Sequence, residues 1–128
     1  ITTRLVGSEM CIRDRYTPLE SVAFHVPTIT TDLAGFGLWV NSLKGRYSEL
    51  KDGVKVIHRS DYNYSEVADV IKDTISEFSG LPENTIKIVR KNAADIAEKA
   101  LWKHFIKYYY EAYDVALHNA QKRLVMNS

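Results

Sequence analysis

The residues of this chain that are best placed to bind a charged ligand stand at the start of a predicted helix. Thr17, Pro18 and Glu20 follow the order Thr-Pro-x-Glu, which is the pattern of a capping box that opens a helix. The first amide groups of a helix have no partners within it and lie at the positive end of its dipole, so they can hold a diphosphate. Judged on spacing alone, Glu20 is better explained as a capping residue than as a ligand-binding residue.

The segments that follow predict the elements that would position this helix start. Val26 precedes a proline and ends the helix, and the β-branched run from Thr28 to Thr31 predicts a short strand. A loop is predicted from Asp32 to Gly37, directly after that strand, where ligands bind in open parallel sheets. A simple turn of the chain explains its glycines equally well. The candidate ligand-facing residues of this loop are Gly35, Phe36 and Gly37.

The rest of the chain predicts one more strand and a series of long helices. Val54 to Ile57 forms a second buried strand, and a helix begins near Asn63 and closes at Gly80. From about Asn84 apolar residues recur at helical spacing to the end of the chain. The apolar stripe changes phase near residues 100–102, where we expect a break. Helices and strands in this order predict an α/β fold with a parallel sheet.

Charge and cysteine content weigh against several classes of function. The chain carries 17 basic and 16 acidic residues, and such a balance favours neither a nucleic-acid partner nor a membrane partner. No apolar run is long enough to cross a bilayer, and we expect a cytoplasmic enzyme. Cys11 is the sole cysteine, and the four histidines do not show the spacing of metal ligands. We therefore expect no disulfide and no metal site.

The block from Tyr16 to Gly37, which contains YTPLES and VPTITTDLAGFG, resembles the donor-site region of glycogen synthases of the fungal and animal type. These are retaining glucosyltransferases with two Rossmann-like domains in the GT-B arrangement, and they are kin to bacterial glycogen and starch synthases. Later stretches resemble the same family: GVKVIHR at residues 53–59, residues 64–78, and LWKHFIKYYYEAYDVAL at residues 101–117. The resemblance implies a partial Rossmann-like C-terminal domain with long C-terminal helices.

The resemblance also implies an activity and a set of ligands. Members of this family transfer glucose from a nucleoside diphosphate glucose to the non-reducing end of an α-1,4-glucan. The implied donor is UDP-glucose or ADP-glucose, the acceptor is an α-glucan, and no cofactor is needed. At the matching family positions, the amides of Tyr16 and Thr17 meet the donor pyrophosphate, and the carboxylate of Glu20 contacts the ribose hydroxyls. These three residues are the donor-binding candidates.

We do not expect residues 1–15 to belong to this family. The stretch LVGSEMCIRDR at residues 5–15 resembles a translated sequencing adapter, so we expect a non-native tail at 1–15 and the C-terminal part of the nucleotide-sugar-binding domain at 16–128. The family motif has a first glutamate eight positions before Glu20, where this chain has Ile12. We therefore expect a fragment whose N-terminal GT-B domain is missing. Such a fragment should be inactive alone and should self-associate through its last helix.

Two alternatives to a glycogen synthase remain open. A glucan phosphorylase shares the two-domain arrangement but holds pyridoxal phosphate on a lysine, and no lysine here stands in a recognisable cofactor context. A non-catalytic interaction module is the other alternative, which the balanced charge and the long amphipathic helices support.

Overall fold

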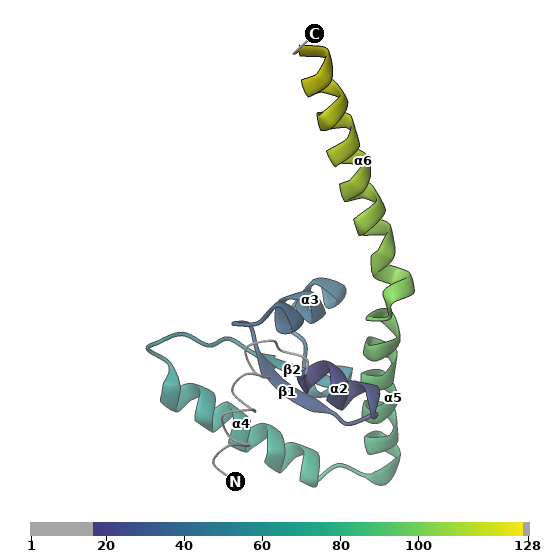
Figure 1. The fold of residues 1–128 in the computed structure, drawn as a ribbon. Helices are drawn as coiled ribbons and strands as arrows, with labels where there is room; N and C mark the ends of the chain where they lie inside the picture. Colours follow the sequence, from purple (N-terminus) through teal and green to yellow (C-terminus); the bar gives the residue numbers. More distant parts are fainter. Residues whose placement is uncertain (1–16, 127–128) are drawn as a thin grey trace, which may run out of the picture. The chain divides into compact units, whose positions relative to one another are not determined.

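The structure is a computed structural model in which residues 17–126 are described (Figure 1). Tyr16 and the predicted tail of residues 1–15 lie outside the described residues. The chain divides into two compact units, of which the first ends at Glu98 and the second begins at Lys99. In chain order the elements are α2 (Thr17–Ala23), β1 (Thr28–Thr31), α3 (Gly35–Lys44), the short 3-10 helix η1 (Leu50–Asp52), β2 (Val54–Ile57), α4 (Tyr64–Ser79), α5 (Glu83–Lys99) and α6 (Trp102–Met126).

A pair of parallel strands forms the centre of the first unit (Figure 1). β1 pairs with β2 so that Thr28 lies opposite Val54 and Thr31 lies opposite Ile57. The ladder continues past the strand end, because the Asp32 N–H donates to the Ile57 carbonyl at 3.1 Å. The structure thus confirms both predicted strands and an α/β arrangement with a parallel pair. A complete Rossmann-like domain is larger than this sheet and remains a prediction.

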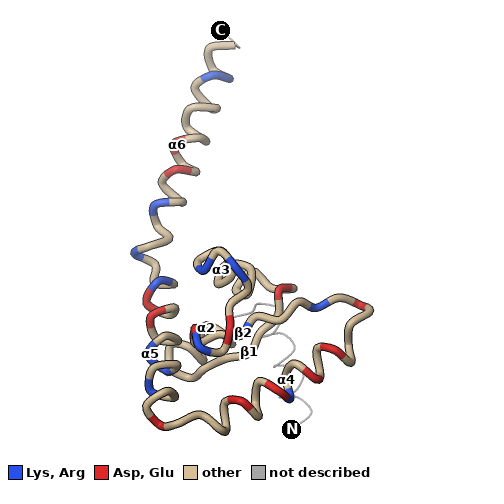
Figure 2. The backbone as a smooth tube through the Cα atoms, turned by 180° about the vertical axis from the view of Figure 1, so that it is seen from behind, with Lys and Arg blue, Asp and Glu red and all other residues tan. Residues whose placement is uncertain are grey.

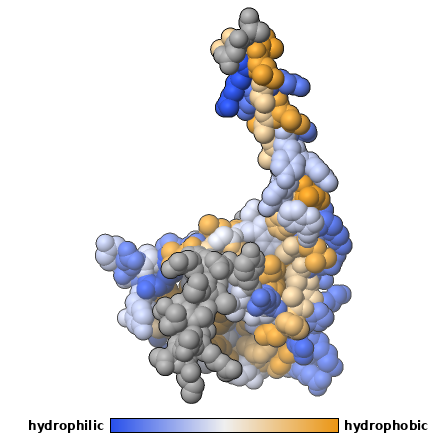
Figure 3. Space-filling view, viewed as in Figure 1, coloured by the Kyte–Doolittle hydropathy of each residue, from blue (hydrophilic) through white to orange (hydrophobic). Residues whose placement is uncertain are grey.

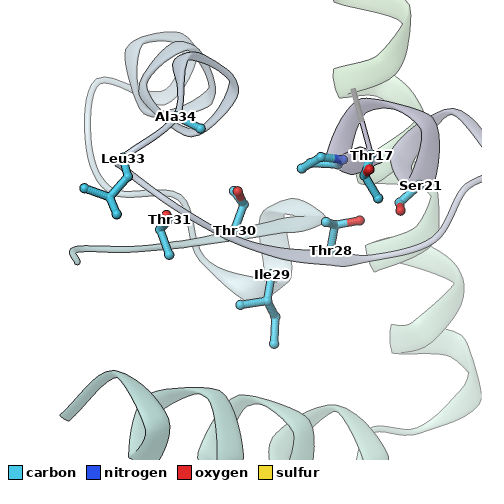
Figure 4. Close-up of a pocket in the computed structure, with 9 residues that line it drawn as sticks. Thr17, Ser21, Thr28, Ile29, Thr30, Thr31, Leu33 and Ala34 are labelled. Carbon is cyan, nitrogen blue, oxygen red and sulfur yellow. The ribbon is translucent and has the colours of Figure 1, made fainter. Parts of the chain in front are cut away.

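The hydrophobic core lies on one face of this sheet. Successive side chains of a strand point to opposite faces, so Val54 and Val56 of β2 share the core face while Ile29 of β1 points to the other face, toward α4 (Figure 4). Burial of aliphatic side chains is the main favourable term in folding. The core residues are Val22 of α2, Val40 of α3, Val54 and Val56 of β2, and Ala93 and Ile96 of α5.

Helix α2 is shorter than its apolar pattern predicts. Val22 is its one buried residue, and Phe24 follows the helix in a turn with 79% of its surface exposed. His25 has a φ of 61°, a left-handed conformation that an α-helix does not contain. The helix expected to end at Val26 therefore ends at Ala23, because the chain turns before it reaches Pro27.

Helix α3 occupies part of the segment for which the sequence predicts a loop. Only residues 32–34 form a turn, and the helix begins at Gly35. A side chain at Gly37 would place its Cβ 2.2 Å from the carbonyl oxygen of Thr31, so this glycine allows α3 to lie directly on β1. The loop expected through Gly37 is therefore wrong from residue 35 onward. Glycine has a low helix propensity, which is why the pattern indicates a loop.

The connection from α3 to β2 is fixed by two buried polar residues. Asp52 forms an ion pair with Arg46, whose Nη2 lies 2.9 Å from Oδ2 of the carboxylate. The carbonyl of buried Ser48 accepts a hydrogen bond of 3.0 Å from the Val56 N–H.

At Gly53 φ is 93°, and a Cβ there would lie 2.3 Å from the amide nitrogen of Ala93. This glycine therefore permits close contact between the start of β2 and α5.

The long helices follow the predicted pattern closely. α4 begins one residue after Asn63 and is followed by Gly80, and a break separates Lys99 from Trp102, as expected from the change in phase. Figure 2 shows acidic and basic residues interspersed along α5 and α6. None of the helices described between residues 17 and 126 is both long and apolar enough to cross a membrane.

Candidate functional site

A groove of about 470 Å³ opens between the start of α2, strand β1 and the turn that leads into α3 (Figure 4). It lies within the first unit and includes the helix start that the sequence singles out. The residues that line it are Thr17, Pro18 and Ser21 of α2, Thr28, Ile29, Thr30 and Thr31 of β1, and Leu33 and Ala34 of the turn.

Hydroxyl groups give this mostly apolar groove its polar chemistry. Figure 4 shows Thr28 and Thr30 on the side of β1 that faces Thr17 and Ser21 of α2. The Thr28 hydroxyl donates to the Val26 carbonyl at 2.9 Å. Within residues 17–126, the hydroxyls of Thr17, Ser21 and Thr30 have no hydrogen-bond partner. Because each hydroxyl can donate and accept, the groove suits a ligand rich in oxygen atoms.

The predicted donor-binding residues fall into three different situations. Thr17 lines the groove as the first described residue of α2, and Tyr16 lies outside the described residues. Glu20 lies in the first turn of α2 with an exposed side chain, and it is not part of the groove lining. In the part of the chain that the structure describes, no hydrogen bond joins Glu20 to Thr17. The carboxylate of Glu20 is therefore open to solvent rather than engaged in a capping box there.

The three candidate residues of the predicted loop lie in the first turn of α3 instead. Gly35 is exposed, with open space around its backbone, whereas Gly37 is buried against β1. Phe36 packs against the core and lies 5.9 Å from Trp39, measured between ring centroids. None of the three lines the groove described above. The groove wall is instead formed by the two residues just before them, Leu33 and Ala34.

A second polar cluster lies at the carboxyl ends of the two strands. Asp32 follows β1, and its side chain is only 11% exposed. Its Oδ2 lies 2.6 Å from Nδ1 of His58 and accepts a hydrogen bond of 3.0 Å from the Tyr47 hydroxyl. Its Oδ1 accepts a hydrogen bond of 2.9 Å from the Arg59 N–H. One carboxylate therefore joins the end of β1 to the end of β2 and to the segment after α3.

The electrostatics of this cluster follow from its hydrogen bonds. Burial by itself disfavours the charged form of Asp32, but the bonds from His58, the Arg59 amide and Tyr47 outweigh it, so the pKa of Asp32 lies below its usual value. The bond to Asp32 raises the pKa of Tyr47, because the phenol must keep its proton to donate. The carboxylate is thus ionised and the phenol protonated at neutral pH.

Two local signals in the sequence point to these features. In TITT at residues 28–31, Thr28 and Thr30 are two positions apart, which places them on one face of a strand. Asp32 and His58 each follow a strand directly, and the carboxyl ends of neighbouring parallel strands lie at one edge. The contact between Asp32 and His58 could therefore be anticipated. The contact between Tyr47 and Asp32 depends on how the chain folds between the two strands.

No group of three or more histidine, cysteine, aspartate or glutamate side chains that could hold a metal ion lies within residues 17–126. Asp32 and His58 are two such side chains, and their direct contact leaves no room for an ion between them. The expected absence of a metal site and of a cofactor remains a prediction.

Comparison with known proteins gave one match. A family model described as glycogen synthase matches residues 13–126 of the chain. This range contains every described residue, including the groove and the Asp32 cluster. No curated protein and no solved structure matches the chain.

Proposed function

The chain belongs to the glycogen synthase family, and we propose that it is the C-terminal, donor-binding part of a retaining glucosyltransferase. The family supports a glycosyltransferase of glycogen biosynthesis as the parent enzyme, which agrees with the resemblance of the block from Tyr16 to Gly37. The proposed reaction transfers glucose from UDP-glucose or ADP-glucose to the non-reducing end of an α-1,4-glucan. We expect the parent to need no cofactor or metal and to work in the cytoplasm.

The observation that carries this proposal is the groove at the start of α2. It lies in the segment of highest family resemblance, and Thr17, Ser21 and Thr30 offer hydroxyls that no described residue engages. We propose that the donor diphosphate lies against the start of α2, where the amides of Tyr16 and Thr17 can donate hydrogen bonds to it. The same amides would stabilise the negative charge that builds on the leaving diphosphate, which is the usual basis of electrostatic catalysis.

Glu20 has a separate proposed role at the edge of this site. Its side chain is exposed, and in the described residues it makes no hydrogen bond or ion pair. A free carboxylate can accept hydrogen bonds from two neighbouring hydroxyls, as the two oxygens of a ribose present them. We propose that Glu20 holds the nucleotide ribose while the groove holds the diphosphate.

Catalysis would require parts that this chain does not supply. The described residues that line the groove include no acid or base, so we propose that the acceptor glucan and the other wall of the cleft belong to a further domain. That domain is the N-terminal domain of a GT-B enzyme. The chain alone should therefore not incorporate labelled glucose into glycogen, and incorporation by the purified chain would contradict the assignment.

The experiment that tests the donor role compares two variants of the full-length parent. Glu20→Ala should weaken donor binding by about 1–3 kcal/mol, the range for losing a hydrogen bond to a charged group. Glu77→Ala is the matched control, because Glu77 is an exposed glutamate of α4. Calorimetric titration with UDP-glucose and with ADP-glucose measures the donor affinity of both variants and shows which nucleotide base the site prefers. Unchanged donor affinity in Glu20→Ala together with a lower Tm would reduce Glu20 to a helix-capping residue.

A non-catalytic interaction module is supported by one observation, the absence of buried residues in α6 between Trp102 and Met126. A helix with a wide apolar stripe usually packs against a partner. If the full-length parent binds neither donor, this alternative is favoured. If the full-length parent binds either nucleotide sugar, the glucosyltransferase is favoured.

A further inference from the structure

The turn between β1 and α3 forms one wall of the groove, and Asp32 is its first residue. The next two residues, Leu33 and Ala34, line the groove, and the helix that follows uses the Ala34 carbonyl for its first hydrogen bond, to Leu38 at 3.1 Å. Neither Leu33 nor Ala34 offers a side-chain hydrogen bond. The position of this wall therefore depends on how its two ends are held.

Asp32 holds one end of the turn through both its backbone and its side chain. Its N–H donates to the Ile57 carbonyl at 3.1 Å, which continues the ladder with β2. Its carboxylate accepts from His58, Arg59 and Tyr47, and these residues lie 15 to 27 positions away along the chain. Bonds to such distant segments fix the turn relative to the sheet rather than only shaping it locally.

A catalytic role for the Asp32–His58 pair fits the geometry less well. His58 is 64% exposed, yet it does not line the groove. It lines a smaller cavity of about 230 Å³ between β2 and α4, together with Tyr47, Lys55 and Glu66. None of the described residues that line this cavity is a serine, threonine or cysteine that His58 would activate as a nucleophile. The pair is thus better suited to hold the strand ends together.

We propose that Asp32 is a positioning residue that sets the groove wall formed by Leu33 and Ala34. It acts through the turn and makes no contact with the ligand itself. The inference rests on the proposed function only for the identity of the ligand, a nucleoside diphosphate.

The experiment uses the 128-residue chain with Asp32→Asn, which keeps the shape of the side chain and removes its charge. Tyr47→Phe removes one of the three donors. Val89→Ala is the control, because Val89 is buried in α5 and lines neither cavity. Three quantities are measured by NMR: the methyl shifts of Leu33 and Ala34, the hydrogen-exchange rate of the residue-32 amide, and binding of uridine diphosphate followed at Thr17 and Ser21.

Asp32→Asn should move the methyl signals of Leu33 and Ala34, speed exchange of the residue-32 amide about tenfold and weaken uridine diphosphate binding about tenfold, as expected for weakened hydrogen bonds to a charged group. Tyr47→Phe should produce smaller changes in the same direction. Val89→Ala should lower Tm at least as much as Asp32→Asn and leave the methyl signals and the nucleotide affinity unchanged.

Two results overturn the inference. One is that Asp32→Asn leaves the Leu33 and Ala34 methyl signals and the exchange rate as they are. The other is that Val89→Ala changes them equally, which would make the effect a general loss of stability. If the unsubstituted chain does not bind uridine diphosphate, the proposed donor site fails, and the methyl and exchange data, measured without ligand, still decide the role of Asp32.

Discussion

The two units of the chain use their apolar residues in opposite ways. In the first unit, aliphatic residues from three helices and β2 form a closed core, with Val22, Val40 and Ala93 fully buried. In α6, which spans Trp102–Met126, no residue is buried. Both regions carry regular apolar patterns in the sequence. A pattern at helical spacing therefore predicts the helix, but not whether its apolar face has a partner within the same chain.

The apolar residues of α6 remain on the surface of the described chain. Trp102 and Tyr109 lie on one side of the helix with their ring centroids 4.8 Å apart, and Tyr113 and Leu117 continue the stripe and are exposed. Figure 3 shows apolar surface along this helix. Apolar patches of more than a few hundred square ångströms usually mark interaction sites. In our proposal, the N-terminal domain of the parent enzyme covers this stripe.

The close packing of the first unit, which α6 lacks, is tested most severely at two glycines in the first turn of α3. Gly37→Ala should destabilise the chain by about 3 kcal/mol, because its Cβ would collide with the backbone of β1. Gly35→Ala should be neutral or stabilise by up to about 1 kcal/mol, since nothing lies within 4 Å of a Cβ there. Urea unfolding of both variants measures the difference. Equal effects at the two positions would mean that α3 does not lie against β1 as described.

A buried and an exposed aliphatic residue give the second test. Ile96→Ala should lower the free energy of unfolding by about 2–4 kcal/mol, because it leaves a cavity in the core. Leu117→Ala in α6 should change it by less than about 0.5 kcal/mol, as is usual for exposed positions. A large loss of stability in Leu117→Ala would show that α6 contributes to a core in solution.

The stability of the first unit should depend on pH through two carboxylates. In the first unit, hydrogen bonds and ion pairs outweigh burial at Asp32 and Asp52, so the pKa of each lies below its ordinary value of 3.8. A carboxylate with a lowered pKa adds stability that is fully present above about pH 4 and is lost as the pH falls through the lowered value. We expect the urea midpoint to fall on acidification below that pH.

Asp32→Asn should flatten this acid-induced loss, because it removes one of the two carboxylates, and it should cost about 1–2 kcal/mol at neutral pH. Asp114→Asn in α6 is the control, since Asp114 is exposed and has no ion pair among the described residues. An unchanged acid profile in Asp32→Asn would argue against the hydrogen bonds assigned to this carboxylate.

Substitutions on the surface of α6 should have the smallest effect on folding and the clearest effect on self-association of the chain. Leu117→Lys places a charge in the apolar stripe and should reduce the self-association that we expect of the chain. Val115→Lys is the matched control, because Val115 is also exposed and lies two positions earlier, on the opposite side of the helix. Sedimentation velocity compares the two variants. If the unsubstituted chain is a monomer that binds no hydrophobic dye, the stripe does not need a partner.

The sequence was informative about elements with simple local signals. The β-branched run at Thr28–Thr31 and the phase change near Trp102 predicted a strand and a helix break correctly. It misled at Gly35–Gly37, because the propensity of glycine indicates a loop, whereas the tertiary contact between α3 and β1 requires a glycine inside a helix. At such positions, close packing between distant segments decides which residue the helix can contain, and this packing cannot be recognised from the neighbouring sequence.

The candidate site was predictable to a similar degree. Thr17 lines the groove together with hydroxyl residues of β1 that were predicted only as part of a strand, and its role in binding a donor stays a prediction. Tyr47 was not predictable as a partner of Asp32, because the contact depends on the path of the chain after α3. A role for Glu20 follows from family resemblance alone and awaits the donor titration.

The measurement that tests the central claim most directly is a titration of the chain with UDP-glucose and ADP-glucose, followed by NMR at each backbone amide. We predict that one of the two nucleotide sugars shifts the amides of Thr17, Ser21 and Thr30 around the groove, in a saturable manner, and leaves α6 unaffected. Shifts confined to Trp102–Met126, or the absence of any shift with both nucleotide sugars, would contradict a donor site at the start of α2.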